Sequence, residues 1–294
     1  MKTRLNLSIA TIDVALTIDD PALAARSEGR YADFLRQAAA RSPLEIRVAA
    51  APGPPPDDLH PEWVANPAVD AVGTLDRVEL RGLGFAGFLD WSARRGECVV
   101  PAAQAHVDLF VRVALGVELL RRGGTLLHAA AVVRDDFGVA FSGPSGAGKS
   151  TVAEISRAAG LTVLSDEMIA FVPAGVGRRF HGTPFWRGAP LAAPCGALVF
   201  LEQAPRHRAR RLSPAEALPR LMAAGGAPLP LPDVQSAFFE AAGAVLRRVP
   251  AYALEFLPDA GLWDALDAFP EFSFFRPAPP QAPALAPPAG PARP

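Results

Sequence analysis

The sequence predicts an α/β fold, and three observations support that prediction. From about residue 104 onward, short apolar runs alternate with segments of helical periodicity. A glycine-rich segment joins one of these apolar runs to one of the helical segments. Of the 294 residues, 50% are hydrophobic and 20% are charged, which is typical of a folded globular protein. This composition excludes a chain that is disordered throughout.

Proline divides the chain into parts. The sequence holds 31 prolines, and eight of the last 18 residues are proline in company with alanine. Such a tail is typical of a disordered, partly polyproline II segment, and the cluster Pro52 to Pro56 is typical of a loop. We therefore expect a small α+β region over 1–103, an α/β domain over 104–275 and a disordered tail over 276–294.

The N-terminal region shows strands and one helix but no chemical motif. Its apolar segments predict strand character over 5–18 and 44–50, a helix over 21–40 and an extended segment over 74–83. Nothing in these residues indicates a ligand, so structural packing is favoured over a binding role for this region.

In the second region, predicted helices and predicted strands alternate along the chain. A helix is predicted from Val107, where apolar residues recur at helical spacing, to Arg122, before Gly123 ends it. The later elements follow the same apolar periods and glycine stops: strands 125–133 and 137–142, helix 149–159, strands 161–165, 168–172 and 197–201, helices 214–222 and 234–245, strand 251–256 and helix 259–268.

Charge, cysteine and hydropathy exclude several classes of protein. A formal net charge of −1 argues against a nucleic-acid-binding protein. Two cysteines cannot form a disulfide framework or a four-cysteine zinc site, which favours a reducing cytoplasm. Asp13 interrupts the apolar stretch near the N-terminus, so it does not resemble a signal peptide, and no uncharged apolar run is long enough to span a membrane. We expect a cytoplasmic protein.

The segment Gly143 to Ser150 fits the phosphate-binding pattern G-x-x-x-x-G-K-[ST] in full. It follows a predicted strand and opens a predicted helix, which is the context that the pattern requires. Lys149 is one of only two lysines among 29 basic residues, so a chance match is rare in this composition. The motif predicts a nucleotide site, ATP or GTP, that is formed by Gly143, Pro144, Ser145, Gly146, Ala147, Gly148, Lys149, Ser150 and Thr151.

Two further features flank this loop. His128 precedes Lys149 on the neighbouring predicted strand, and the acidic pair Asp166 and Glu167 ends a short strand after the helix. A carboxylate beside a phosphate loop can hold the metal ion or take a proton from an attacking hydroxyl. The plainer alternatives are a solvated turn for the acidic pair and a packed strand residue for His128.

This order of features resembles the catalytic domain of HPr kinase/phosphorylase, a bacterial serine kinase whose mixed-sheet P-loop core is related to phosphoenolpyruvate carboxykinase. The matching segments are Leu126 to His128, Gly138 to Thr151 and Leu164 to Glu167, at the family's spacings. The similarity is strong over 104–172 and weaker to 268. It is greatest to the shorter HPr-kinase-related group.

The resemblance implies an enzyme that uses ATP and Mg²⁺ to phosphorylate a serine or threonine hydroxyl on a protein or peptide. It implies that Lys149 contacts the β- and γ-phosphates, that Ser150 with Asp166 and Glu167 holds Mg²⁺, and that His128 lies beside the transferred phosphoryl group. Because the family usually has two aspartates, the sequence leaves open whether Asp166 or Glu167 is the base. The family's downstream signature loop is absent, so its phosphorylase activity is not expected; homo-oligomers occur in the family.

Other interpretations stay open. A small-molecule or carboxykinase-like phosphotransferase has the same nucleotide site, and a regulatory module would bind nucleotide without turnover. An ABC-type ATPase is disfavoured, since no Leu-Ser-Gly-Gly-Gln segment follows Ser150. The segment 182–187 is either a substrate-binding loop or a hydrophobic plug. The arginines at 206, 208, 210 and 211 could attract an acidic ligand, although a solvated loop is favoured.

Overall fold

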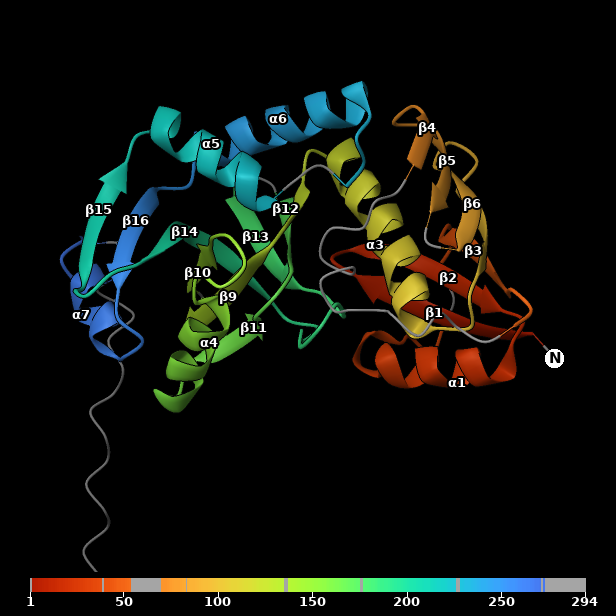
Figure 1. Cartoon of the computed structure of the whole chain (residues 1–294), viewed down its shortest axis with the longest axis horizontal. Helices are drawn as coiled ribbons and strands as arrows, with labels where there is room; N and C mark the ends of the chain where they lie inside the picture. The colour runs from red at the N-terminus through yellow and green to blue at the C-terminus, as the bar shows by residue number, and fades with distance from the viewer. Residues whose placement is uncertain are drawn as a thin grey trace, which may run out of the picture.

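The computed structural model describes residues 2–38, 40–53, 70–82, 84–134, 137–174, 177–225, 228–270 and 272. These residues form a mixed α/β structure with two mixed sheets, as the sequence predicts (Figure 1). The predicted tail over 276–294 and Pro54 to Pro56 of the predicted loop lie outside the described residues. The division of the chain at residue 103 stays a prediction.

The N-terminal sheet has the strand order β1-β2-β3-β7-β6-β5-β4. Strands β2, β3 and β7 run parallel, and the other neighbours in this sheet are antiparallel. The bounds are β1 (Thr3–Ile9), β2 (Ile12–Ile18), β3 (Leu44–Ala50), β4 (Asp70–Gly73), β5 (Arg77–Gly82), β6 (Phe85–Asp90) and β7 (Arg95–Val100).

Two N-terminal predictions need correction. The segment predicted as extended over 5–18 is the hairpin β1–β2, which turns at Ala10 and Thr11 with positive φ angles of 49° and 68°. The helix predicted over 21–40 ends early: α1 covers Pro21–Arg30, and a 3₁₀ turn, η1 (Ala32–Phe34), follows. The helix stops where Tyr31 turns inward, because its fully buried hydroxyl donates a 2.7 Å hydrogen bond to Asp108.

The C-terminal sheet has the order β11-β9-β10-β14-β13-β12-β8, with β16 beside β14 and β15 beyond β16. Strands β10, β14 and β16 are parallel. The bounds are β8 (Thr125–Leu127), β9 (Ala129–Arg134), β10 (Phe137–Ser142), β11 (Thr162–Ser165), β12 (Ile169–Ala174), β13 (Gly177–Gly182), β14 (Ala192–Gln203), β15 (Arg208–Leu212) and β16 (Ala251–Phe256).

The strand predicted over 125–133 is interrupted at His128, which separates β8 from β9. The neighbouring chain is interrupted at the same level, between β11 and β12, where Asp166, Glu167 and Met168 lie. Strand β9 pairs with β11, and β8 pairs with β12. Two adjacent interruptions therefore open the sheet at the point where the predicted site residues lie.

Strands β13 and β15 were not predicted. β15 lies within the arginine run for which a solvated loop was favoured, and it pairs with β16 along an edge of the sheet. The loop prediction was wrong because the backbone of this segment pairs with β16, while its arginine side chains stay exposed and bind acids. Arg206 contacts Glu255 at 2.6 Å, and Arg210 contacts Glu216 at 2.7 Å.

The helices of the described residues complete the layers. Helices α5 and α6 cover one face of the C-terminal sheet, α4 and α7 cover the other, and α3 lies between the two sheets (Figure 1). No helix among the described residues is long and apolar enough to cross a membrane. The bounds are α3 (Gln104–Arg121), α4 (Lys149–Ala158), α5 (Pro214–Gly225), α6 (Pro232–Leu246) and α7 (Gly261–Leu266).

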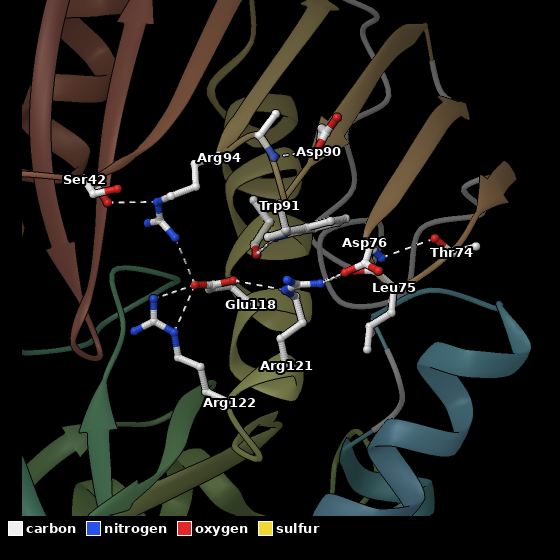
Figure 2. Close-up of polar contacts among 12 residues, drawn as sticks. Ser42, Thr74, Leu75, Asp76, Asp90, Trp91, Arg94, Glu118, Arg121 and Arg122 are labelled. Atoms are coloured by element: carbon white, nitrogen blue, oxygen red, sulfur yellow. Dashed lines mark hydrogen bonds and ion pairs between the residues drawn. The ribbon is translucent and has the colours of Figure 1, made fainter.

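Helix α3 is buried along almost its whole length and shares one core with the N-terminal sheet and α6. Near its C-terminus, Glu118 gathers three arginines (Figure 2). Arg94 approaches from the turn between β6 and β7, and Arg121 and Arg122 come from the end of α3. Arg121 also contacts Asp76. This cluster ties the end of α3 to the N-terminal sheet.

Candidate functional site

The candidate site lies at one edge of the C-terminal sheet. The parallel strands β10, β14 and β16 end at this edge, and so does β11, while the antiparallel β9 begins there. The phosphate loop follows β10 in the middle of the edge. His128, Asp166 and Glu167 lie on one side of the loop, where β9 begins and β11 ends, and Gln203 lies on the other, at the end of β14.

The loop from Gly143 to Gly148 has the backbone that its glycines allow. Gly146 and Gly148 have positive φ angles of 77° and 104°, which side-chain-bearing residues rarely adopt. A Cβ atom on Gly148 would also lie 2.4 Å from the ring of Phe256. Gln203 donates a 2.6 Å hydrogen bond to the carbonyl of Gly146. The loop is thus held open by residues from β14 and β16.

Lys149, the first residue of α4, is only 6% exposed. Its Nζ donates hydrogen bonds of 3.0 Å to the carbonyls of Gly143 and Pro144. Burial lowers the pKa of Lys149, and the nearby charge of Glu167 raises it. The ammonium therefore lies within the loop, beside the helix N-terminus that the predicted phosphates would face. These features fit a nucleotide phosphate chain.

His128 and Glu167 form a pair across the two strand interruptions. Their side chains meet at 3.0 Å, from Nε2 to Oε1. The backbone holds both residues: Ser142 Oγ donates to the His128 carbonyl at 2.9 Å, and the Ala129 N–H donates to the Glu167 carbonyl at 3.1 Å. The hydrogen bond from His128 lowers the pKa of Glu167, and the charges of His128, Lys149 and Arg112 lower it further against the opposing effect of burial. These effects hold the pKa of Glu167 below its ordinary value, and Lys149 of the phosphate loop is one of the cations responsible.

Asp166 lies in a different environment from its neighbour. It is 3% exposed, and its Oδ2 lies 3.6 Å from Arg157 Nη2 on α4. Its buried Oδ1 has no hydrogen-bond partner among the described residues. Asp166 thus lies against Arg157 of α4, whereas its neighbour Glu167 contacts His128.

The predicted metal ligands are Ser150, Asp166 and Glu167. Ser150 is exposed in the first turn of α4, directly after Lys149. Within the described part of the chain, no group of three or more His, Cys, Asp or Glu side chains is arranged to hold a metal ion. Proteins usually hold Mg²⁺ with one or two side chains while phosphate oxygens and water supply the other ligands. Ser150 would hold it from the loop, and the acidic pair from the sheet.

The segment 182–187 has one buried and one exposed aromatic side chain, which fits the predicted plug, and its substrate-binding role stays a prediction. Phe185 is 2% exposed and belongs to the core around α3, whereas Trp186 is 50% exposed and has a positive φ of 71°. Thr183 Oγ1 donates to the carbonyl of Met168 at 2.8 Å, which fixes the segment next to the acidic pair. Arg30 of α1 donates to the Trp186 carbonyl at 3.1 Å. One aromatic is a plug, and the other faces solvent beside the site.

Sequence reasoning missed three contributors to this site: Arg112, Gln203 and Phe256. Arg112 was visible as a charged residue within an apolar helix, which is a signal for a buried polar function. Gln203 and Phe256 end their strands beside the loop, but nothing local in the sequence indicates which strands lie next to β10. Their placement depends on the strand order alone.

A search with the sequence found no matching protein-family model and no matching curated protein. The function is therefore argued from the geometry of the site.

Proposed function

We propose that the protein is an ATP- and Mg²⁺-dependent kinase that phosphorylates a serine or threonine hydroxyl of a protein or peptide. The observation that carries the proposal is the 3.0 Å pair of His128 and Glu167 near the phosphate loop, where the charges of Glu167 and Lys149 affect each other's pKa. A nucleotide loop alone names only a ligand, but an ionised carboxylate beside the loop lysine adds a proton acceptor where an incoming hydroxyl would lie. The resemblance to the HPr kinase catalytic domain supports the same activity.

Each residue has a physical role in this proposal. The loop N–H groups and the ammonium of Lys149 bind the β- and γ-phosphates, and Ser150 orients the metal ion. Bound ATP with Mg²⁺ supplies the phosphoryl group and neutralises part of its charge. Glu167 takes the hydroxyl proton while the acceptor oxygen bonds to the γ-phosphorus and the bond to ADP breaks. His128 holds the Glu167 carboxylate in place through its 3.0 Å contact.

The test measures transfer from γ-labelled ATP to a panel of serine- and threonine-containing peptides and small hydroxyl compounds. Wild-type protein should label an acceptor, and both Lys149→Ala and Glu167→Gln should abolish labelling. Asp166→Asn should retain more activity than Glu167→Gln, since Asp166 faces Arg157 instead of the lysine. Labelling that survives both Lys149→Ala and Glu167→Gln would rule out this site. Tight ATP binding with no transfer to any acceptor would favour a regulatory module.

A further inference from the structure

Arg112 lies at the level of the site although it is far from the loop in sequence. Helix α3 and β8 are joined by a short turn and run antiparallel, and Gly116 of α3 faces Leu126, since a Cβ on the glycine would lie 3.4 Å from Leu126 Cδ1. Arg112 lies one helical turn back, about 6 Å along the axis. His128 lies two residues forward, about 6.6 Å along the strand direction. Arg112 and His128 therefore lie at about the same position along the axis of α3.

Arg112 is nine-tenths buried without a bonded partner. It is 9% exposed, and no hydrogen bond or ion pair joins it to any residue within the described ranges. The nearest acid on its helix is Asp108, whose oxygens are already occupied: Oδ1 accepts from Tyr31 and Gln104, and Oδ2 contacts Arg30 at 2.9 Å. The guanidinium thus keeps donors that no described residue uses.

Glu167 lies near enough to both Arg112 and Lys149 to be affected by their charges. The charges of both cations lower the pKa of Glu167. Burial lowers the pKa of Arg112 to about 10, and the charges of Asp108 and Glu167 oppose that change. The Glu167 carboxylate is therefore under the influence of two cations, one from the phosphate loop and one from α3.

We propose that Arg112 binds a carboxylate or phosphate group of the acceptor, so that the preferred substrate carries an anionic group close to its reacting hydroxyl. This inference rests on the proposed kinase activity. The charges of Arg112 and Glu167 act on each other, so an acceptor whose hydroxyl meets Glu167 comes close to Arg112. A planar guanidinium with free donors matches a carboxylate or phosphate in a bidentate pair. An anionic ligand would also supply the charge that this buried cation lacks.

The experiment compares acceptors that differ only in one charge. The first arm uses serine peptides with Asp or Asn next to the serine, and the second uses a small hydroxy acid and its amide. Wild-type protein should prefer the anionic member of a pair in kcat/KM. Arg112→Gln should raise KM for the anionic acceptor about 30-fold or more, as expected for the loss of a buried ion pair, and leave KM for ATP unchanged. KM for the neutral acceptor should change far less than KM for the anionic one. An effect with the peptides identifies the anion as a group of a peptide acceptor, and an effect with the hydroxy acid identifies it as a group of a small molecule.

Arg121→Gln is the matched control, because Arg121 lies on the same helix but contacts Glu118 and Asp76 away from the site. Arg112→Lys keeps the charge and should retain part of the preference, which separates charge from packing. Equal kcat/KM for charged and neutral acceptors in the wild type would overturn the inference while leaving the kinase proposal intact. So would an equal loss for both acceptors in Arg112→Gln. Calorimetry in the presence of a non-hydrolysable ATP analogue measures acceptor binding without turnover, so it tests the inference even if the kinase proposal fails. Anionic acceptors that bind the wild type and Arg112→Gln equally well, or bind neither, would overturn the inference.

Discussion

Helix α3 carries two buried charges, one with several ion-pair partners and one with none among the described residues. Glu118 is 5% exposed and contacts Arg94, Arg121 and Arg122. Arg112, on the same helix, is 9% exposed and has no ion pair with any described residue. Burying an ion costs free energy unless partners compensate for the lost water. Glu118 has such partners within the described chain, and Arg112 does not. We infer that Glu118 serves structure and that Arg112, like Lys149, serves a ligand.

This difference separates the two ends of the helix by role. The Glu118 end ties α3 to the turn between β6 and β7, in the N-terminal sheet (Figure 2). The Arg112 end faces the interrupted strands of the C-terminal sheet. Between Arg112 and the N-terminal helix α1 lies Asp108, which binds Arg30 and Tyr31. The N-terminal region therefore supports the residue next to Arg112 and, through it, the side of the site that we assign to the acceptor.

The largest expected effect is on the activity of variants at Lys149, a buried charge that we assign to ligand binding. Lys149→Ala should lower the transfer rate by about a thousandfold, and Lys149→Arg nearly as much, because a planar guanidinium does not fit where an ammonium contacts two loop carbonyls at 3.0 Å. Steady-state kinetics measure the loss, and thermal unfolding should show that both variants remain folded. A Lys149→Arg variant with wild-type activity would contradict the assigned role.

Substitution of Glu118, the buried charge that we assign to structure, should lower stability and leave ligand binding unchanged. Glu118→Gln leaves three arginines without their shared carboxylate and should lower the free energy of unfolding by about 2–3 kcal/mol, below the full value for a buried pair because the arginines are partly exposed. Urea unfolding measures the change. Affinity for ATP should be unaltered at temperatures where the variant is folded. Unchanged stability would show that the cluster in Figure 2 is not a structural anchor.

The pH dependence of Glu167 offers an intermediate test. Its folded pKa is lowered, first by the hydrogen bond from His128, so its ionised form adds stability above the unfolded value of 4.5. That contribution is lost as the pH falls through the folded pKa, which lies below 4.5. The difference in Tm between wild type and Glu167→Gln should therefore be constant near neutral pH and shrink below pH 4.5. A difference that grows on acidification would show that the carboxylate is not held in its ionised form.

The sequence predicted those parts of the protein whose signals are local. The loop Gly143 to Ser150 was correctly placed between a strand and a helix because its glycine spacing is unusual, and strand 44–50 matched residue for residue. The hairpin turn at Ala10 and Thr11 was missed, since these residues are not the Asn and Gly that normally mark such turns.

Features that depend on tertiary contacts were beyond local prediction. The chain from 125 to 133 has unbroken strand propensity, and only pairing with β11 and β12 accounts for the interruption at His128. In the same way, Asp166 and Glu167 lie in the interruption between β11 and β12, and their different partners follow from tertiary contacts. Whether an interior charge such as Arg112 has a partner is decided by neighbours that are distant in sequence, so composition and periodicity carry no signal for it.

The smallest expected effect has the opposite sign to that of Glu118 and tests the comparison most directly. Arg112→Met removes a buried cation that makes no ion pair with the described residues and replaces it with a flexible apolar chain of similar length. Stability should stay the same or rise by about 1 kcal/mol, since the cost of burying the charge is removed along with it. The same variant should lose the preference for anionic acceptors. Paired urea unfolding and acceptor kinetics on one protein sample decide the matter, because a residue that only packs would lose stability on substitution and leave the acceptor preference untouched.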